Sequence, residues 1–260
     1  MLLCFAFQVY INSQSFFQSM KPYHERKKSR FQDQFKTMND IFDYSTEEVL
    51  WKLISQGVIE GLDAPLSIGK EANIFTAQTR DHQQRIVKIY RVMTSDFTKM
   101  YSYIRADARF QGLHKNKRSV VYAWCQREYK NLFRAREAGC VVPTPFAAMK
   151  NVLIMECVGS DEPAQKLSTE KPTDMKRFFA EVVKNMQLLR KAGLVHGDLS
   201  PYNILNNNQL PVLIDFSQAT TKDNPNYDEF FARDIKNIAS YFSRNKIDIT
   251  EAQLKKKVES

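Results

Sequence analysis

Two short segments in the second half of the chain carry polar residues with the types and spacing that phosphoryl transfer requires. The segment 196–203 reads HGDLSPYN, and 215–217 reads DFS, directly after a strand-like VLI run. Because the transferred phosphoryl group carries spread negative charge, the site needs a carboxylate facing the acceptor and oxygen ligands that hold Mg²⁺ against the phosphates. We expect Asp198 to orient or deprotonate the acceptor, and Asn203 and Asp215 to bind the metal ion. Asp and Asn are also common in turns, but the complete spacing is far more specific than any single member.

A phosphate site also needs a cation, and Lys88 is the candidate. It lies in the alternating run IVKIY, where its side chain faces away from Val87 and Ile89. From there it can pair with the α- and β-phosphates of ATP, although a lone Lys on a strand is usually only solvated. Glu128, in the helix-like run WCQREYKNL, could hold Lys88 in place by an ion pair.

The turn between two expected strands offers a second phosphate contact. The run LSIGKEA contains Ser67, Gly69 and Lys70, whose hydroxyl, backbone N–H groups and ammonium could cradle phosphates. One Gly in a turn would mean nothing by itself, so this prediction depends on Lys88 and Asp215. The predicted substrate is ATP and the predicted metal is Mg²⁺, with Mn²⁺ as a second cation that the same ligands could hold.

The elements expected ahead of these residues are one helix and several short strands. Ser45 with Glu48 makes a capping box, and the apolar pattern of 49–54 then runs to Gly57, a typical helix stop. From Val58 on, turn residues separate β-prone runs, which predicts an antiparallel sheet. The runs are VIEGL, APLSIG, ANIFTAQ and RIVKIYRV.

The chain then changes from strand-like to helical. Residues 95–116 are aromatic and charged without strand alternation, and residues 120–138 have a helical pattern ended by Gly139. Two strand candidates, VVPTPFAAMK and NVLIMECVG, lead to Gly159. A mostly β half followed by a mostly α half predicts an α+β fold with two lobes, and a cleft between lobes is a usual ligand site. The elements expected in the second half are a helix over 176–191, a β region over 194–214 and a last helix over about 228–242.

Composition indicates a globular chain with a basic surface. Of the 260 residues, 43% are hydrophobic and 26% are charged, which suffices for one large core or two small lobes. The formal net charge of +9 suits a polyanionic partner, and nucleotide, RNA and anionic membrane are the candidates. The basic clusters at 21–30, 115–118 and 255–257 are each, taken singly, typical of a plain solvated surface.

The cysteines and the opening residues favour a cytoplasmic protein without a membrane anchor. The four cysteines form no C-x-x-C pair and have no His at ligand spacing, so neither a zinc site nor a disulfide framework is indicated. The apolar run MLLCFAFQVY lacks a basic start and a cleavage site and is too short to span a bilayer. It is either an extension from a start upstream of Met20 or a helix that caps the body. The cysteines are Cys4, Cys125, Cys140 and Cys157.

Eight segments, in order between Phe42 and Phe242, resemble the RIO family of atypical serine/threonine protein kinases, and most of all the archaeal members of its first subfamily. The resemblance implies a two-lobed protein-kinase-like fold, with a β-rich N-lobe and a reduced helical C-lobe that lacks the usual peptide-substrate platform. The segments are SIGKEANIF (67–75), VKIYRV (87–92), YIRADARF (103–110), AWCQREYKNL (123–132), NVLIMECVG (151–159), LVHGDLSPYNIL (194–205), LIDFSQA (213–219) and FFARDIKNI (230–238).

The resemblance also implies roles for the segment between the lobes. Met155 corresponds to the gatekeeper, and Glu156 and Val158 to the hinge whose backbone meets adenine. Residues 103–116 correspond to a flexible loop of the family. The implied division is an N-terminal extension and basic tail over 1–37, an N-terminal helix and N-lobe over 38–155, a hinge over 156–160 and a C-lobe over 161–260.

Three positions depart from the family pattern. Ile68 stands where Thr is usual in the phosphate loop, Pro201 replaces a common Glu in the catalytic loop, and Ser217 stands where Gly is usual after Asp-Phe. None of them removes a predicted metal ligand or the lysine predicted to pair with the phosphates. We therefore expect them to affect rate and loop geometry more than nucleotide binding.

The expected use of the site differs from that of ordinary protein kinases. Only 45 residues follow Asp215 and no A-P-E segment occurs among them, so we expect no peptide-binding platform. The resemblance implies a Mg-ATP-dependent kinase and ATPase that binds maturing small ribosomal subunits and their RNA and acts as a release switch. The switch would use either a phosphorylated Asp215 or direct attack by water.

Two other interpretations stay open. Kinases of the aminoglycoside or choline type also carry H-G-D-L-x-x-x-N-I-L followed by I-D-F, although they lack GKEA and the DARF loop and add a large helical subdomain. A catalytically inactive RNA- or ribosome-binding scaffold would suit the net charge. Its weakness is that every residue expected to touch ATP and metal is present.

Overall fold

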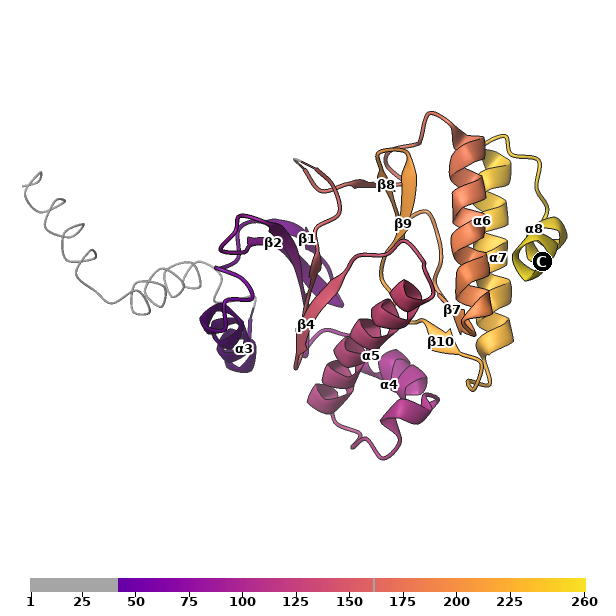
Figure 1. Cartoon of the computed structure of the whole chain (residues 1–260). Coiled ribbons are helices and arrows are strands. Elements are labelled where there is room, and N and C mark those ends of the chain that lie inside the picture. Colours follow the sequence, from indigo (N-terminus) through magenta and orange to yellow (C-terminus); the bar gives the residue numbers. More distant parts are fainter. Residues whose placement is uncertain (1–41, 161) are drawn as a thin grey trace, which may run out of the picture. The chain divides into compact units, whose positions relative to one another are not determined.

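The computed structural model describes residues 42–160 and 162–260 (Figure 1). The described residues fall into two compact units, one ending at Gly61 and the other running from Leu62 to Ser260. The predicted extension over 1–37 lies outside the described residues, and with it the apolar opening run, the basic cluster at 21–30 and Cys4. The predicted division of the chain at residues 156–160 stays a prediction.

The first unit contains helix α3, Tyr44–Ser55. Its N-cap is Asp43, whose carboxylate accepts a hydrogen bond from the backbone N–H of Thr46 at 2.9 Å. The predicted capping box at Ser45 is therefore wrong, because an equally good cap two residues upstream starts the helix earlier. The predicted stop is confirmed: Gly57 adopts a φ of 75°, which glycine reaches without steric cost.

A five-stranded antiparallel sheet opens the second unit, in the order β1-β2-β3-β5-β4. The run VIEGL at 58–62 forms no strand, contrary to the prediction, and its Glu60 and Gly61 are both poor strand formers. The two predicted strands on either side of residue 150 are confirmed. The strands are β1 Pro65–Ile68, β2 Ala72–Gln78, β3 Gln84–Tyr90, β4 Pro145–Met149 and β5 Val152–Glu156.

Helical segments separate β3 from β4. Helix α4, Phe97–Arg105, and the 3₁₀ turn η1, Ala108–Phe110, form an insertion that the sequence patterns did not predict. Helix α5, Lys117–Glu137, starts three residues before the predicted helix. Its N-cap, Asn116, accepts from the Ser119 N–H at 2.9 Å.

The second half is helical with short strands, as predicted, although the two-residue strands at Gln165–Lys166 and Thr220–Thr221 lie outside the predicted β region. Helix α8 was not predicted, because only Leu254 and Val258 of its nine residues are buried and its apolar stripe is correspondingly weak. Figure 1 shows α8 beside the pair α6 and α7, and Phe179 of α6 meets Phe242 of α7 at 4.8 Å between ring centroids. The elements are β6 Gln165–Lys166, α6 Met175–Lys191, β7 Leu194–Val195, β8 Ile204–Asn207, β9 Leu210–Leu213, β10 Thr220–Thr221, α7 Tyr227–Arg244 and α8 Glu251–Glu259.

One apolar core joins α5 to the helices of the second half. Trp124 of α5, Phe178 of α6 and Phe216, which follows Asp215, are each at most 2% exposed and belong to it. The sheet and the helical half are thus two lobes of an α+β, protein-kinase-like fold, which confirms the predicted fold class. Within residues 42–160 and 162–260, every helix is too short or too polar to cross a membrane.

Candidate active site

A cavity of about 330 Å³ lies between the sheet and the helical half. Its size is at the lower end of the range for small-molecule sites. Strands β1, β2, β3 and β5 form one wall, while the segment around β6 and the residues next to β8 and β9 form the other. The lining residues are Leu66, Ser67, Ile74, Ile86, Lys88, Glu128, Pro143, Met155, Glu156, Cys157, Val158, Pro163, Ala164, Gln165, Lys166, Thr169, Asn203, Leu205, Ile214 and Asp215.

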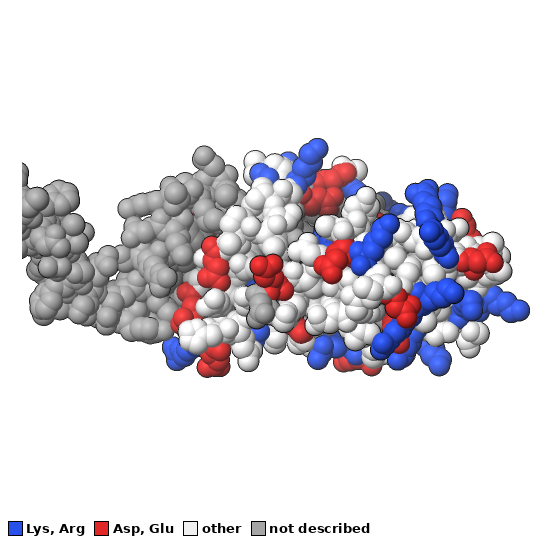
Figure 2. Space-filling view, turned by 90° about the horizontal axis from the view of Figure 1, so that it is seen from above, with Lys and Arg blue, Asp and Glu red and all other residues white. Residues whose placement is uncertain are grey.

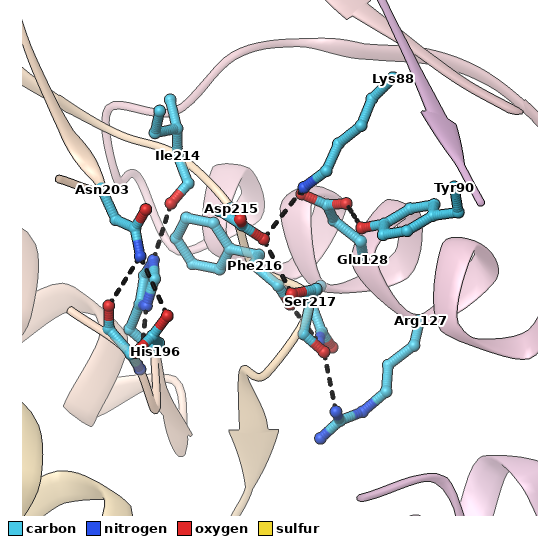
Figure 3. Close-up of polar contacts among 12 residues, drawn as sticks. Lys88, Tyr90, Arg127, Glu128, His196, Asn203, Ile214, Asp215, Phe216 and Ser217 are labelled. Atoms are coloured by element: carbon cyan, nitrogen blue, oxygen red, sulfur yellow. Dashed lines mark hydrogen bonds and ion pairs between the residues drawn. The ribbon is translucent and has the colours of Figure 1, made fainter. Parts of the chain in front are cut away.

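Lys88 joins two carboxylates at this cavity (Figure 3). Its Nζ lies 2.9 Å from Oε1 of Glu128 on α5 and 3.0 Å from Oδ1 of Asp215. Burial lowers the pKa of the Lys88 ammonium, but the charges of Asp215 and Glu128 raise it by more. The pKa of Lys88 is therefore above its usual value. Lys88 therefore remains a cation, and the Glu128 contact is the geometry that the predicted ion pair requires.

Tyr90 completes the environment of Glu128 and was not among the predicted residues. Its hydroxyl donates to Oε2 of Glu128, so both carboxylate oxygens are hydrogen-bonded. Because side chains two apart on a strand share a face, the run KIY places Tyr90 beside Lys88. That alternation is the sequence signal that could have identified it. The buried carboxylate of Glu128 is thereby fixed from two sides.

Asp215 occupies an unusual backbone conformation. Its φ is 63°, in the left-handed region that non-glycine residues rarely adopt. Its Oδ1 accepts from the Ser217 hydroxyl at 2.8 Å as well as from Lys88. Burial raises the pKa of the Asp215 carboxyl, but the charge of Lys88 and the Ser217 hydroxyl lower it more, to about 2. Asp215 is therefore a carboxylate at neutral pH, and strain of this kind is common where a side chain must be aimed at a reaction.

Asn203 and Asp198 of the segment 196–203 lie together, and Asn203 lines the cavity. The amide nitrogen of Asn203 donates to the Asp198 carbonyl at 2.8 Å and to its Oδ2 at 3.2 Å. With its nitrogen used in this way, Asn203 presents its amide oxygen as the group available to a metal. Burial and the negative charge of Asp215 raise the pKa of the Asp198 carboxyl, which suits a group that must accept a proton.

The donor set at this site fits Mg²⁺. No group of three or more His, Cys, Asp or Glu is gathered for a metal within the described residues. Mg²⁺ is usually held by one or two carboxylates together with the phosphates of a substrate. Asp215 and Asn203, both on the cavity wall, would hold it there, and the bound ion would neutralise charge on the phosphates.

Asp234 of α7 supports the catalytic loop. Its two carboxylate oxygens accept from the backbone N–H groups of Gly197 and Leu199, each at 2.8 Å. Burial raises the pKa of this carboxyl to about 7, against the lowering effect of those two hydrogen bonds. Asp234 lies in the run FFARDIKNI, which carried the family resemblance without a role for this residue. These two hydrogen bonds fix the backbone on either side of Asp198.

His196 connects the catalytic loop to the strand that precedes Asp215. Its Nε2 lies 3.0 Å from the Ile214 carbonyl, and its Nδ1 lies 3.3 Å from the Asp198 backbone N–H. These partners require the neutral ring with the proton on Nε2. Burial lowers the pKa of His196 to about 4, in agreement with that tautomer.

The predicted nucleotide-base contacts lie on the cavity wall. Met155, Glu156 and Val158 all line it. The Glu156 carboxylate accepts from both the backbone N–H and the hydroxyl of Thr144, at 3.0 and 2.7 Å. With its side chain tied back in this way, Glu156 would offer a base its backbone carbonyl, as the resemblance implies for a hinge.

The predicted phosphate turn is only partly at the cavity. Ser67 lines it, whereas Gly69 and Lys70 are absent from its wall. Gly69 closes the β1–β2 hairpin instead, with its N–H 3.1 Å from the Ala72 carbonyl, and Ile68 is 55% exposed. The phosphate-binding roles of Gly69 and Lys70 stay predictions.

Comparison with known proteins connects this site to one family. The model of the RIO domain matches residues 73–255. The RIO-type serine/threonine-protein kinase Rio1 of Haloferax volcanii is 42% identical over 217 residues, which are 83% of this chain and 75% of the relative. Rio1 of Methanocaldococcus jannaschii is 36% identical over 234 residues, which are 88% and 79% of the two chains. Human serine/threonine-protein kinase RIO1 is 31% identical, and the match spans 82% of this chain but 39% of the human protein.

A solved structure shows the same fold at lower sequence identity. The ADP/Mg²⁺-phosphoaspartate complex of the Rio2 kinase from Chaetomium thermophilum matches with a TM-score of 0.63 and 20% identity. The match covers 82% of this chain and 65% of that chain. The fold likeness agrees with the RIO-domain match and with the archaeal Rio1 relatives. The chain therefore belongs to the RIO family of atypical serine/threonine protein kinases, and it is a phosphotransferase.

Proposed function

We propose that this kinase is a Mg-ATP-dependent ATPase that acts as a switch in the maturation of the small ribosomal subunit. The observation that carries the ATP-dependent part is the contact of Lys88 with both Glu128 and Asp215 at the wall of the cavity. A cation held between two carboxylates is the arrangement that kinases use to bind ATP phosphates and position the metal. Asp198 and Asn203 supply the remaining acceptor-side and metal-side groups.

The proposed substrate is ATP, with Mg²⁺ as its metal. Lys88 would pair with the α- and β-phosphates, and Ser67 of β1 would lie near them. The base would meet the wall formed by Met155, Glu156 and Val158. Asp215 and Asn203 would hold the metal against the phosphates.

The short connection after Asp215 supports a switch rather than a peptide kinase of the ordinary type. Only residues 216–226 separate Asp215 from α7, and they contain strand β10, which pairs with β7. Ordinary protein kinases insert a long activation segment at this position and bind the acceptor peptide beside it. The γ-phosphoryl group of ATP would then meet water and the carboxylates of the site.

The charge of the chain supports a ribosomal RNA partner. The formal net charge is +9, and Figure 2 shows many Lys and Arg side chains on the part of the second unit that α6, α7 and α8 form. Lys255–Lys257 on α8 and residues 115–118 at the start of α5 are exposed. Basic groups of this kind bind phosphates through release of counterions. A cytoplasmic place of action goes with this proposed partner.

The release step would use either of two reactions. In one, a carboxylate oxygen of Asp215 attacks the γ-phosphorus, ADP leaves, and water then hydrolyses the acyl phosphate. The Rio2 structure from Chaetomium thermophilum is described as a phosphoaspartate complex, which favours this route. In the other, water attacks the γ-phosphorus directly and Asp215 only binds the metal.

ATP hydrolysis with and without purified small ribosomal subunits tests the proposal. We expect subunits to change the steady-state rate of the wild-type protein, and we expect no hydrolysis by Asp215→Ala. Lys236→Ala, on the exposed side of α7, is the matched control and should hydrolyse ATP like the wild type. A rate that subunits leave unchanged would contradict the ribosomal partner. Nucleotide binding without measurable hydrolysis would favour the scaffold interpretation instead.

A further inference from the structure

Side chains of α5 hold the segment that follows Asp215, and the proposed reaction does not use them. Arg127 is fully buried, and its Nη1 donates to the Ser217 carbonyl at 2.8 Å (Figure 3). Its Nη2 reaches the Gln218 carbonyl at 3.5 Å. The helix that positions Glu128 thus also binds the backbone next to the predicted metal ligand.

Asn131, one turn further along α5, binds the same segment. Its amide nitrogen donates to the carbonyls of Phe216 and Ala219, at 3.0 and 2.7 Å, and its side chain is also fully buried. Together with the contacts of Arg127, four consecutive carbonyls, those of residues 216–219, receive donors from α5. A left-handed φ is unfavourable for Asp215 and persists only where the surrounding structure holds the backbone firmly. The hydrogen bonds from α5 hold the segment that follows Asp215 in this way.

The insertion between β3 and α5 supplies the counter-charge for this arrangement. Asp107 accepts from Nε of Arg127 at 3.1 Å and from Nε of Arg109 at 2.9 Å. Arg109 in turn donates to Oδ1 of Asn131 at 3.0 Å. Burial lowers the pKa of Arg127 to about 10, and the Asp107 carboxylate opposes that shift, so the guanidinium is charged at neutral pH. A buried charge left without its partner is strongly destabilising, which couples Arg127 to the insertion.

The catalytic loop provides no alternative support for this segment. The residue between His196 and Asp198 is Gly197, where the H-R-D pattern of protein kinases has Arg. Gly197 has a φ of 79°, and a Cβ on it would lie 2.9 Å from the Gln218 carbonyl. The close approach leaves no room for a side chain there, and the guanidinium comes from α5 instead.

We propose that Arg127 and Asn131 are positioning residues for Asp215, and that Asp107 makes this positioning depend on docking of the insertion 97–110. None of the three residues lines the cavity. They act through the backbone of residues 216–219, which determines where the Asp215 carboxylate lies. The proposal rests on the proposed role of Asp215 as a metal ligand.

This arrangement predicts an effect on Mg²⁺ rather than on the nucleotide itself. Binding of ADP without metal depends on Lys88 and on the wall at Met155, Glu156 and Val158, and substitutions in the network change none of these residues. The gain in ADP affinity on adding Mg²⁺ depends on the position of Asp215. Changes to residues that orient a metal ligand typically cost about 10- to 100-fold in metal affinity, and we expect a loss of that order in the Mg²⁺ gain.

The test is calorimetric titration of the full chain with ADP, once in EDTA and once in Mg²⁺. The variants are Arg127→Lys, which keeps the charge but loses the forked donors, Asn131→Asp, which is isosteric but loses the amide donors, and Asp107→Asn. Arg134→Gln, exposed on the same helix, is the matched control. We expect the ADP affinity in EDTA to stay within about twofold of wild type, as for changes remote from a site, while the Mg²⁺ gain falls in the three network variants only. Hydrogen exchange of residues 216–221 should accelerate in the same three.

Each contrary result would refute one part of this proposal. Equal losses in EDTA and in Mg²⁺ would show a merely structural role, and an unchanged Mg²⁺ gain in folded Arg127→Lys or Asn131→Asp would refute the positioning role. A wild-type Mg²⁺ gain in Asp107→Asn would refute the dependence on the insertion. Should Arg127→Lys not fold, Asn131→Asp and Asp107→Asn decide the question. A wild-type protein that binds ADP no better with Mg²⁺ contradicts the proposed function itself, which distinguishes that failure from failure of the network.

Discussion

The hydroxyl of Ser217 donates a 2.8 Å hydrogen bond to Oδ1 of Asp215, the same oxygen that Lys88 contacts at 3.0 Å. Ser217 stands where the family usually has Gly, so this donor is a property of the present sequence. It helps to lower the pKa of the Asp215 carboxyl to about 2. A less basic carboxylate is a weaker nucleophile, and Ser217 therefore opposes acyl-phosphate formation at Asp215.

We expect Ser217→Ala to raise the rate of acyl-phosphate formation at Asp215 by about threefold to tenfold, since a hydrogen bond to a charged group contributes roughly 1.5–3 kcal/mol and only part of it is lost in the transition state. Nucleotide affinity should change little, because Lys88 and Glu128 remain. Rapid acid quench with γ-labelled ATP measures the rate. A rate below that of the wild type would show that the hydroxyl assists the reaction.

Lys88→Ala and Asp215→Ala should each abolish productive Mg-ATP binding or turnover. One change removes the phosphate cation and the other the metal carboxylate, and loss of one such interaction typically costs about 10²-fold or more in rate. Steady-state hydrolysis and ATP affinity measure the effect, with Lys236→Ala as the control. Because Lys88→Ala also leaves Glu128 buried without its cation, its melting temperature must be recorded alongside. Wild-type turnover in either folded variant would refute the site.

His196 should make the fold sensitive to acid. Its pKa is about 4 in the folded chain and 6.5 in the unfolded chain, so the unfolded state binds the extra proton between these values. The free energy of unfolding therefore falls as the pH drops from 6.5 to 4, by at most roughly 3.5 kcal/mol at about 1.4 kcal/mol per pH unit. Above pH 6.5 this contribution is fully present.

Urea unfolding at a series of pH values measures how steeply the free energy of unfolding changes with pH. His196→Gln should be less stable than the wild type at pH 7 but should lose less stability between pH 6.5 and 4. His114→Gln, on an exposed residue, should keep the slope of the wild type. An equal slope in His196→Gln would assign the acid sensitivity to other groups.

Local patterns predicted most of the elements, while long-range partners came only from the structure. Alternation and helical periodicity predicted the five strands of the sheet, the β region over 194–214 and helices α5 to α7, but not the two-residue strands β6 and β10. Helix α8 and the insertion helix α4 have nine residues each and bury only two of them, which is too few for a helical period to be recognised. The capping-box pattern predicted Ser45 as the cap of α3, whereas the cap is Asp43, and both side chains can accept the same kind of bond.

The site was predictable where a motif spaces its residues and not where the partners are distant in sequence. Asp198, Asn203 and Asp215 follow from one spacing. Arg127 and Asn131 bind carbonyls 85 to 91 residues away, and backbone acceptors carry no residue identity that a sequence could display. The polar composition of YIRADARF and REYKN was the only sequence signal for them.

The basic residues at the start of α5 are expected to contact ribosomal RNA. Lys115, Lys117 and Arg118 are exposed, and the first turn of α5 contains no acidic residue. Reversing all three to Glu should weaken binding to small subunits and lower the salt slope by about one unit for each phosphate that the protein no longer neutralises. ATP affinity should be unchanged. Acidic residues near a helix N-terminus interact favourably with the helix dipole. The variant with the three reversed charges should therefore fold at least as well as the wild type.

Filter binding over a range of KCl concentrations checks this placement. Lys52→Glu/Lys130→Glu/Lys222→Glu, with three exposed lysines outside the start of α5 and outside α6, α7 and α8, is a control of equal charge change. Equal weakening by both triple variants would indicate a response to net charge alone. An unchanged subunit affinity in the α5 variant would refute this placement of the RNA-binding surface.

The last prediction distinguishes the two reactions proposed for Asp215. If the Asp215 carboxylate attacks ATP, Asp198 would orient the water that later hydrolyses the acyl phosphate, since its raised pKa suits a proton acceptor. Asp198→Ala should then slow turnover, by about 10²-fold for loss of a general base, while a phosphorylated protein accumulates. If water attacks ATP directly, the same variant should lose turnover without any phosphorylated species.

Incubation with γ-labelled ATP, acid quench and hydroxylamine treatment separates these outcomes, because hydroxylamine cleaves an acyl phosphate but not phosphoserine. The double variant Asp198→Ala/Asp215→Asn is the control, since its amide cannot form the acyl phosphate while the shape of the site is kept. Label that is hydroxylamine-sensitive in Asp198→Ala and absent from the double variant would place the phosphate on Asp215. Label that survives hydroxylamine would instead indicate a hydroxyl acceptor. If Asp198→Ala binds Mg-ATP normally but carries no sensitive label, Asp215 is a metal ligand only, and the switch operates through direct hydrolysis.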